Sequence, residues 1–238
     1  MADNMISRYW AIVPAAGVGS RMQSDIPKQY LTLNNKTVIE HTLSRLTQLG
    51  SIEAIVVAIS AEDTQWSKLA HEYSKPVQTV DGGKERCHSV LNALNALAGS
   101  AAADDWVLVH DAARPCVRST DLEKLVADLK EHAVGGLLGV PVRDTMKRSD
   151  KNNIVTETVE RNNLWHALTP QMFRFEQLQE ALTKALEDGF LVTDEASAME
   201  YAGHKPIMIE GHADNIKITR PEDLSLADYY LQQQNETE

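Results

Sequence analysis

The chain has 238 residues, of which 43% are hydrophobic and 24% charged, and its formal net charge is −11. This composition is typical of a globular protein with one large domain or two small ones. The acidic charge argues against broad binding to nucleic acid or to anionic membranes. Cys87 and Cys116 are too few for a disulfide framework or a zinc site. No signal peptide or membrane-spanning apolar run is apparent, so we expect a cytoplasmic protein.

Apolar runs alternate with helical patterns over the first 142 residues. The predicted buried strands lie at residues 10–13, 52–59, 77–80, 106–109 and 136–142, and the predicted helices at residues 37–49, 85–98 and 121–131. Ser119 or Thr120, with Glu123 in a capping-box arrangement, is the predicted N-cap of the third helix. Strands that alternate with helices favour a parallel sheet covered on both faces, with ligands at the carboxyl ends of the strands.

The alternation breaks between about residues 141 and 163. Residues 143–148 and 154–159 read as two polar strands joined by a turn. Because these strands carry little to bury, they predict an arm that projects from the body and packs on a second subunit. The elements predicted after the arm are a strand near residues 164–168, helices at 175–188 and 194–202, a strand at 207–209 and a final helix opened by Pro221.

The first strand leads into a loop of small residues that contains Gly17 and Gly19 and is followed by Arg21 and Lys28. Glycine permits positive φ angles and close approach, so such a loop can turn its N–H groups onto a phosphate that the two cations then neutralise. No Walker A Lys-Ser or Lys-Thr pair follows, and Met22 stands where a dinucleotide fingerprint has its third glycine. The alternative is a plain strand-to-helix turn, but the added cations favour a site for a nucleoside triphosphate or another polyanion.

Asp111 follows the predicted strand at residues 106–109 and should face the cleft that the glycine loop borders. A carboxylate beside phosphates supplies the hard oxygen ligands that Mg²⁺ prefers. A helix N-cap or an internal partner for Arg114 are the alternatives. The neighbouring glycine loop favours the role of Asp111 as a metal ligand over these alternatives.

A second glycine pair, Gly82 and Gly83, follows the third strand. It would let the backbone approach a base or ribose that Ser89 could hydrogen-bond. The alternative is a simple turn with Glu85 in the first helical turn. Asp194 and Glu195 open a predicted helix and most simply satisfy its positive end.

Several cations lie in the arm and in the distal segment. They could hold a phosphorylated second substrate, or they could be solvated surface charges, which is the favoured interpretation for Lys147 and Arg148. The residues concerned are Thr145, Lys147, Arg148 and Arg161 in the arm, with Asp214 and Lys217 in the distal segment.

Taken together, the motifs resemble those of the 2-C-methyl-D-erythritol 4-phosphate cytidylyltransferase family of the non-mevalonate isoprenoid pathway. They occur in family order over nearly the whole chain, at residues 14–22, 27–30, 82–89, 110–115, 141–145, 161–171 and 213–217. The resemblance implies an α/β fold with a Rossmann-like, mostly parallel sheet of the glycosyltransferase-A type. It also implies a single nucleotidyltransferase domain over residues 1–238, with a dimerisation arm at about 141–163, and a homodimer with interlocking arms.

The implied reaction joins CTP to methylerythritol phosphate with Mg²⁺, giving 4-diphosphocytidyl-methylerythritol and pyrophosphate. The implied catalytic cations are Arg21 and Lys28, and the implied carboxylates for metal are Asp111 and Asp214. The implied nucleotide contacts are Pro14, Ala15, Ala16, Gly17, Gly19, Gly83, Lys84, Ser89, Asp111 and Ala112. The implied contacts to the second substrate are Arg114, Thr145, Arg161, Thr169 and Lys217, with Thr145 and Arg161 reaching the substrate of the partner subunit.

Three other functions are considered beside this one. A ribitol 5-phosphate cytidylyltransferase would share the nucleotide half of the site, and only the resemblance of residues 161–171 and 213–217 speaks against it. An NAD-dependent oxidoreductase would need the missing third glycine and an acidic residue at the end of the second strand, which ends at Ser60. A non-catalytic nucleotide-binding subunit would be expected to lack Lys28 or Asp111, and both are present.

Overall fold

A seven-stranded sheet forms the centre of the protein, for which a computed structural model describes residues 7–17, 22, 26–70 and 72–237. In spatial order the strands are β11 (Ile207–Glu210), β7 (Gly135–Pro141), β10 (Trp165–Arg174), β6 (Trp106–Val109), β1 (Tyr9–Pro14), β4 (Ile52–Ile59) and β5 (Val77–Asp81). β10 runs antiparallel to β6 and β7, and the other pairs are parallel. The predicted mostly parallel sheet is therefore confirmed.

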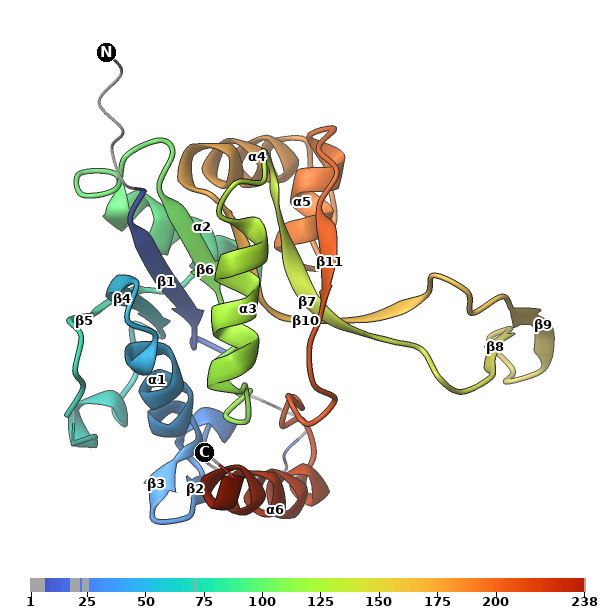
Figure 1. Cartoon of the computed structure of the whole chain (residues 1–238), viewed down its shortest axis with the longest axis horizontal. Helices are drawn as coiled ribbons and strands as arrows, with labels where there is room; N and C mark the ends of the chain where they lie inside the picture. Colours follow the sequence, from blue (N-terminus) through green and yellow to red (C-terminus); the bar gives the residue numbers. More distant parts are fainter. Residues whose placement is uncertain (1–6, 18–21, 23–25, 71, 238) are drawn as a thin grey trace.

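Helices cover both faces of the sheet because its strands are apolar on both sides (Figure 1). Ala11 and Val13 of β1 pack toward α1 (Val38–Gln48) and α3 (Ser119–Leu129). Trp10 and Ile12, which alternate with them, pack toward α2 (Arg86–Leu97), α4 (Phe175–Glu187) and α5 (Glu195–Tyr201). This period of two is the pattern of a strand buried on both faces.

A third apolar cluster joins the C-terminal helix to the end of the sheet that carries the loops. α6 (Pro221–Thr237) packs through Ala227 and Leu231 against Cys116 and Ile218. Beside it lie the short strands β2 (Thr32–Leu33) and β3 (Lys36–Thr37) and the 3-10 turn η2 (Lys28–Tyr30). A second 3-10 turn, η3 (Trp66–Lys68), lies between β4 and β5. None of the helices in the described part of the chain is long and apolar enough to cross a lipid bilayer.

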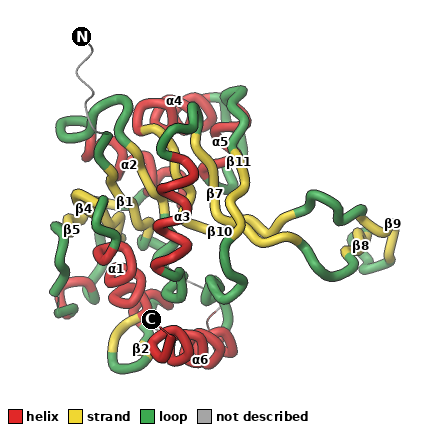
Figure 2. The backbone as a smooth tube through the Cα atoms, in the orientation of Figure 1, coloured by secondary structure: helices red, strands yellow, loops and turns green. Residues whose placement is uncertain are grey.

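The predicted arm is present and projects well away from the sheet (Figures 1 and 2). Its tip is a two-stranded ribbon of β8 (Met146–Ser149) and β9 (Val155–Val159). Arg148 pairs across this ribbon with Glu157, at an Nε–Oε1 distance of 2.5 Å, in keeping with a surface charge. Ile154 and Val155 leave 63% and 58% of their surface exposed. The arm thus buries few of its own apolar groups.

Two local predictions differ from the structure. The strand expected near residues 164–168 is present, but it extends through Arg174 as β10 and lies inside the sheet. Proline is disfavoured in central strands because it has no N–H to donate. Pro170 is accommodated here by an irregularity in the β10–β7 register between Ala167 and Gln171. The N-cap of α3 is Arg118, without a side-chain cap. Helix formation begins at Ser119, so the predicted capping box with Glu123 cannot form.

Candidate active site

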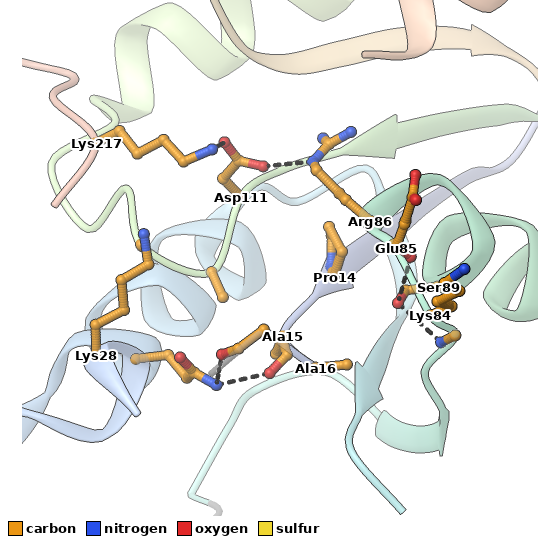
Figure 3. A pocket seen from close by; sticks show the side chains of 15 residues that line it. Pro14, Ala15, Ala16, Lys28, Lys84, Glu85, Arg86, Ser89, Asp111 and Lys217 are labelled. Carbon is orange, nitrogen blue, oxygen red and sulfur yellow. Dashed lines mark hydrogen bonds and ion pairs between the residues drawn. The ribbon is translucent and has the colours of Figure 1, made fainter. Parts of the chain in front are cut away.

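An open cavity of about 310 Å³ lies where the carboxyl ends of β1 and β6 meet the start of α2 (Figure 3). Its walls come from five separate segments of the chain. The lining residues are Pro14, Ala15, Ala16, Gly17, Lys28, Gln29, Gly83, Lys84, Glu85, Arg86, Ser89, Asp111, Ala112, Ala113 and Lys217. Within an acidic protein, the cavity thus collects four cationic side chains, as an anionic ligand requires.

The described start of the loop after β1, residues 15–17, is held by hydrogen bonds with neighbouring segments. The Ala15 N–H donates to the Ala58 carbonyl at 2.7 Å, and Gln29 Nε2 donates to the carbonyls of Ala15 and Gly17 at 2.7 and 3.2 Å. Gly17 is not among the positive-φ glycines of the described chain. A Cβ at Gly17 would meet no atom within 4 Å. Its backbone is therefore open to a ligand.

The second glycine pair provides close packing of the protein against itself. A Cβ on Gly82 would lie 2.3 Å from the Cβ of Ala16, and one on Gly83 would lie 2.3 Å from that of His88. Ser89 Oγ accepts the Gly83 N–H at 3.0 Å and donates to the Glu85 carbonyl at 3.2 Å. Ser89 lines the cavity, but in this structure its hydroxyl closes the loop at the start of α2.

Asp111 stands at the centre of a cluster of cations (Figure 3). Its Oδ1 accepts from Arg86 Nε at 2.8 Å, and its Oδ2 lies 2.8 Å from Lys217 Nζ and 3.5 Å from Arg114 Nε. Burial alone would raise the pKa of Asp111, but Arg86 and Lys217 outweigh it and hold the pKa well below its usual range. Asp111 is therefore an ionised carboxylate at physiological pH.

A chain of hydrogen bonds positions the backbone of Asp111. The Asp111 N–H donates to Thr169 Oγ1 at 3.1 Å, and that hydroxyl lies 3.0 Å from His110 Nδ1. His110 Nε2 lies 3.0 Å from the Arg114 carbonyl, to which it must donate. Nδ1 then accepts from the Thr169 hydroxyl. Burial lowers the pKa of His110 to about 4, so the ring is neutral and cannot act as a base toward a ligand in the cavity.

The donor set at Asp111 fits a divalent cation. An ionised carboxylate on a cavity wall that is otherwise rich in cations is a hard oxygen ligand beside a phosphate site. Asp214 is placed differently and does not line the cavity. Its Oδ2 is bound by Arg118 Nη2 at 2.6 Å and by Gln234 Nε2 at 3.0 Å. Its Oδ1 is buried without a hydrogen-bond partner among the described residues. The metal role of Asp214 therefore stays a prediction.

Most of the predicted nucleotide residues meet at this cavity. The predicted residues that line it are Pro14, Ala15, Ala16, Gly17, Lys28, Gly83, Lys84, Ser89, Asp111, Ala112 and Lys217. Thr169 and Arg114 are buried behind Asp111 and support it. Thr145 and Arg161 are exposed in the arm, away from the cavity. Arg21 and Gly19 lie outside the described residues.

Sequence reasoning missed Gln29, Glu85, Arg86 and Ala113 as cavity residues. All four lie inside the recognised motifs at residues 27–30, 82–89 and 110–115, which was the only available signal for them. Asp194 caps the start of α5, as predicted, and the structure adds a capping box with Ser197. Its neighbour Glu195 does not serve the helix end alone, because both of its carboxylate oxygens accept hydrogen bonds from Arg86.

Comparisons with known proteins show the family to which the chain is related. Residues 9–233 match the family described as 2-C-methyl-D-erythritol 4-phosphate cytidylyltransferase. The chain is 50% identical over 236 residues to the enzyme of that name from Vibrio vulnificus (strain CMCP6), covering 99% of each chain. It is 54% identical over 226 residues to the Vibrio cholerae enzyme, covering 95% of this chain and 97% of the other.

Solved structures show the same relationship. The crystal structure of the Francisella tularensis 2-C-methyl-D-erythritol 4-phosphate cytidylyltransferase aligns with a TM-score of 0.82 at 41% identity, covering 94% of this chain and 100% of the other. A structure titled 4-diphosphocytidyl-2C-methyl-D-erythritol synthase aligns with a TM-score of 0.83 at 36% identity, covering 94% and 99%. The chain belongs to the 2-C-methyl-D-erythritol 4-phosphate cytidylyltransferase family.

Proposed function

We propose that the cavity is the site at which this enzyme, as a member of its family, transfers CMP from CTP to 2-C-methyl-D-erythritol 4-phosphate. The observation that carries the assignment of the site is that Lys28, Arg86 and Lys217 line one cavity with Asp111 in a protein of net charge −11. Small residues at the end of β1 leave room for the nucleotide beside these charges.

The chemistry requires positioning more than proton transfer. A phosphate monoester has a second pKa of about 6 and is largely dianionic at neutral pH. One of its oxygens attacks the α-phosphorus of CTP, a new P–O bond forms, and the bond to pyrophosphate breaks with its electrons leaving on pyrophosphate. No general base is needed, and the buried, neutral His110 supplies none. Lys28 and, by resemblance, Arg21 would neutralise the leaving pyrophosphate.

Asp111 would hold a divalent cation, with Mg²⁺ as the expected ion. The chemistry that this ion would supply is neutralisation of phosphate charge. Asp111 offers Oδ2 if Lys217 moves from that oxygen to a phosphate group. The Lys217 side chain is 37% exposed, so it has room for this movement.

The site for the second substrate would be completed by another copy of the chain. Thr145 and Arg161 lie in the exposed arm and do not line the cavity of their own chain. The exposed Ile154 and Val155 at the arm tip offer apolar surface for a partner. A homodimer with exchanged arms would bring the arm residues to the partner's cavity and bury this surface. Two buried free cysteines accord with a cytoplasmic location.

The reaction is tested by pyrophosphate release with CTP and Mg²⁺, run in parallel with methylerythritol 4-phosphate and with ribitol 5-phosphate. We expect turnover with the first only. Preference for ribitol phosphate would overturn the substrate while leaving the nucleotide site intact. The relatives and solved structures described above give no support to the ribitol substrate.

The dimer is tested by light scattering on the variant Ile154→Asp/Val155→Asp. We expect the wild type to be a dimer and the variant a monomer, because charges at the arm tip oppose burial. Leu191→Asp is the matched control, since Leu191 is an exposed apolar residue (76%) outside the arm. A monomeric wild type, or a variant that stays dimeric, would contradict the proposed use of the arm tip.

A further inference from the structure

Glu195 is a fully buried carboxylate (0% exposed) to which the mechanism above assigns no role. It is the first residue of α5, and its Oε1 and Oε2 accept from Arg86 Nη1 and Nη2 at 2.6 and 3.0 Å. Two parallel N–H···O bonds of this kind fix the plane of a guanidinium group as well as its position. The orientation of Arg86 is therefore set by a residue 109 positions away in the chain.

The start of α5 is itself held from the central sheet. Gln171 Nε2 donates to Asp194 Oδ2 at 2.8 Å, and Gln171 Oε1 accepts the Ala196 N–H at 2.7 Å. Gln171 belongs to β10 and pairs with Val109, the last residue of β6. Asp111 follows two residues later. β10 and β6 therefore position both Glu195 and Asp111, and Arg86 lies between these two carboxylates.

This arrangement restricts what Arg86 can offer to Asp111. With Nη1 and Nη2 held by Glu195, only Nε reaches Asp111, and it binds Oδ1 alone. Oδ2 is left for Lys217 at 2.8 Å, with Arg114 Nε farther away at 3.5 Å. The side chain of Arg86 is 27% exposed on the cavity wall, so it has room to turn if Glu195 releases it. A released guanidinium would favour a bidentate pair with both Asp111 oxygens.

We propose that Glu195 is a positioning residue, which holds Arg86 to one oxygen of Asp111 and thereby keeps the other oxygen free for Lys217 or a divalent cation. The proposal rests on the metal role proposed above for Asp111. Glu195 touches neither the cavity nor a ligand within it, since it is fully buried and does not line the wall. Its effect is exerted through Arg86.

The test is the variant Glu195→Gln, which keeps the shape of the side chain and removes its charge. The readout is the rise in melting temperature that CTP produces, titrated with Mg²⁺ in the absence of the second substrate, together with the Mg²⁺ dependence of turnover. We expect the half-saturating Mg²⁺ concentration to rise about tenfold or more, the effect of one hydrogen bond to a charged group. The rise in melting temperature with CTP and no metal should change little.

Ser197→Ala is the matched control. Ser197 belongs to the capping box of the same helix but has no described contact with Arg86. We expect it to lower the melting temperature without changing the half-saturating Mg²⁺ concentration. If it raises that concentration as much as Glu195→Gln does, a loosened helix explains both effects and the proposal is overturned.

The double variant Arg86→Gln/Glu195→Gln covers the case in which the single variant does not fold, because it leaves no unpaired buried charge. It should return the half-saturating Mg²⁺ concentration toward the wild-type value, since Arg86 then no longer competes for Asp111. A tenfold rise in the double variant, or none in Glu195→Gln, would overturn the role of Glu195. A wild type whose stabilisation by CTP is independent of Mg²⁺ would overturn the metal role of Asp111 instead.

Discussion

His110 should make this protein markedly less stable in acid. The ring is fully buried and donates from Nε2 to the Arg114 carbonyl, while Nδ1 accepts from the Thr169 hydroxyl. A protonated ring would place a second N–H against that hydroxyl, which already accepts the Asp111 N–H. Burial and this hydrogen bonding favour the neutral form. The pKa of His110 is accordingly lowered from 6.5 to about 4, with burial as the largest cause.

The sign and size of this loss of stability follow from the pKa of His110 in the folded and in the unfolded chain. The unfolded chain binds a proton near pH 6.5, whereas the folded protein binds it only near pH 4. The free energy of unfolding contributed by His110 is thus fully present above pH 6.5 and is lost as the pH falls toward 4. Each pH unit in this window costs about 1.4 kcal/mol, so the loss should reach about 3 kcal/mol. That is a large share of a typical stability of about 5–15 kcal/mol.

The assay is urea unfolding of wild type and His110→Gln at several pH values between about 7.5 and 4. Glutamine can still donate to the Arg114 carbonyl but cannot titrate. We expect the variant to be less stable than wild type at neutral pH, with the difference shrinking by about 2–3 kcal/mol at acidic pH. His166→Gln, at an exposed position in β10, should follow the wild-type curve. Parallel curves for wild type and His110→Gln would refute the reasoning.

Three further substitutions test the site. Lys28→Ala should lower kcat about a hundredfold, as the loss of one electrostatic donor does. The control Lys84→Ala, which changes another lysine that lines the cavity, should alter kcat little. Equal effects of the two substitutions in steady-state assays would remove the special role of Lys28. Gly82→Ala should raise KM for CTP and reduce stability by about 1–3 kcal/mol, because its Cβ would lie 2.3 Å from that of Ala16. Unchanged urea unfolding and KM would contradict this packing. Arg161→Ala should raise KM for methylerythritol phosphate and leave KM for CTP unchanged, and a normal KM for the sugar phosphate would count against its role.

The local elements could be predicted because their signals are local. Apolar runs located β4 and β6 to the residue. Three walls of one site were indicated by local features: small residues after a strand, a glycine pair before a helix, and an aspartate after a buried strand. Parallel strands place such loops at the same edge of a sheet, so their meeting could also be expected.

What the sequence by itself determined was therefore the order of strands and helices, the projecting arm and the residue types that face a nucleotide. Only the tertiary structure decided which partners these side chains take. β10 lies inside the sheet despite Pro170, and Glu195, at the start of α5, pairs with Arg86. Asp214 pairs with Arg118 instead of facing the cavity. Such pairings depend on long-range burial, because a charge removed from water binds the best-placed opposite charge whatever its distance along the chain.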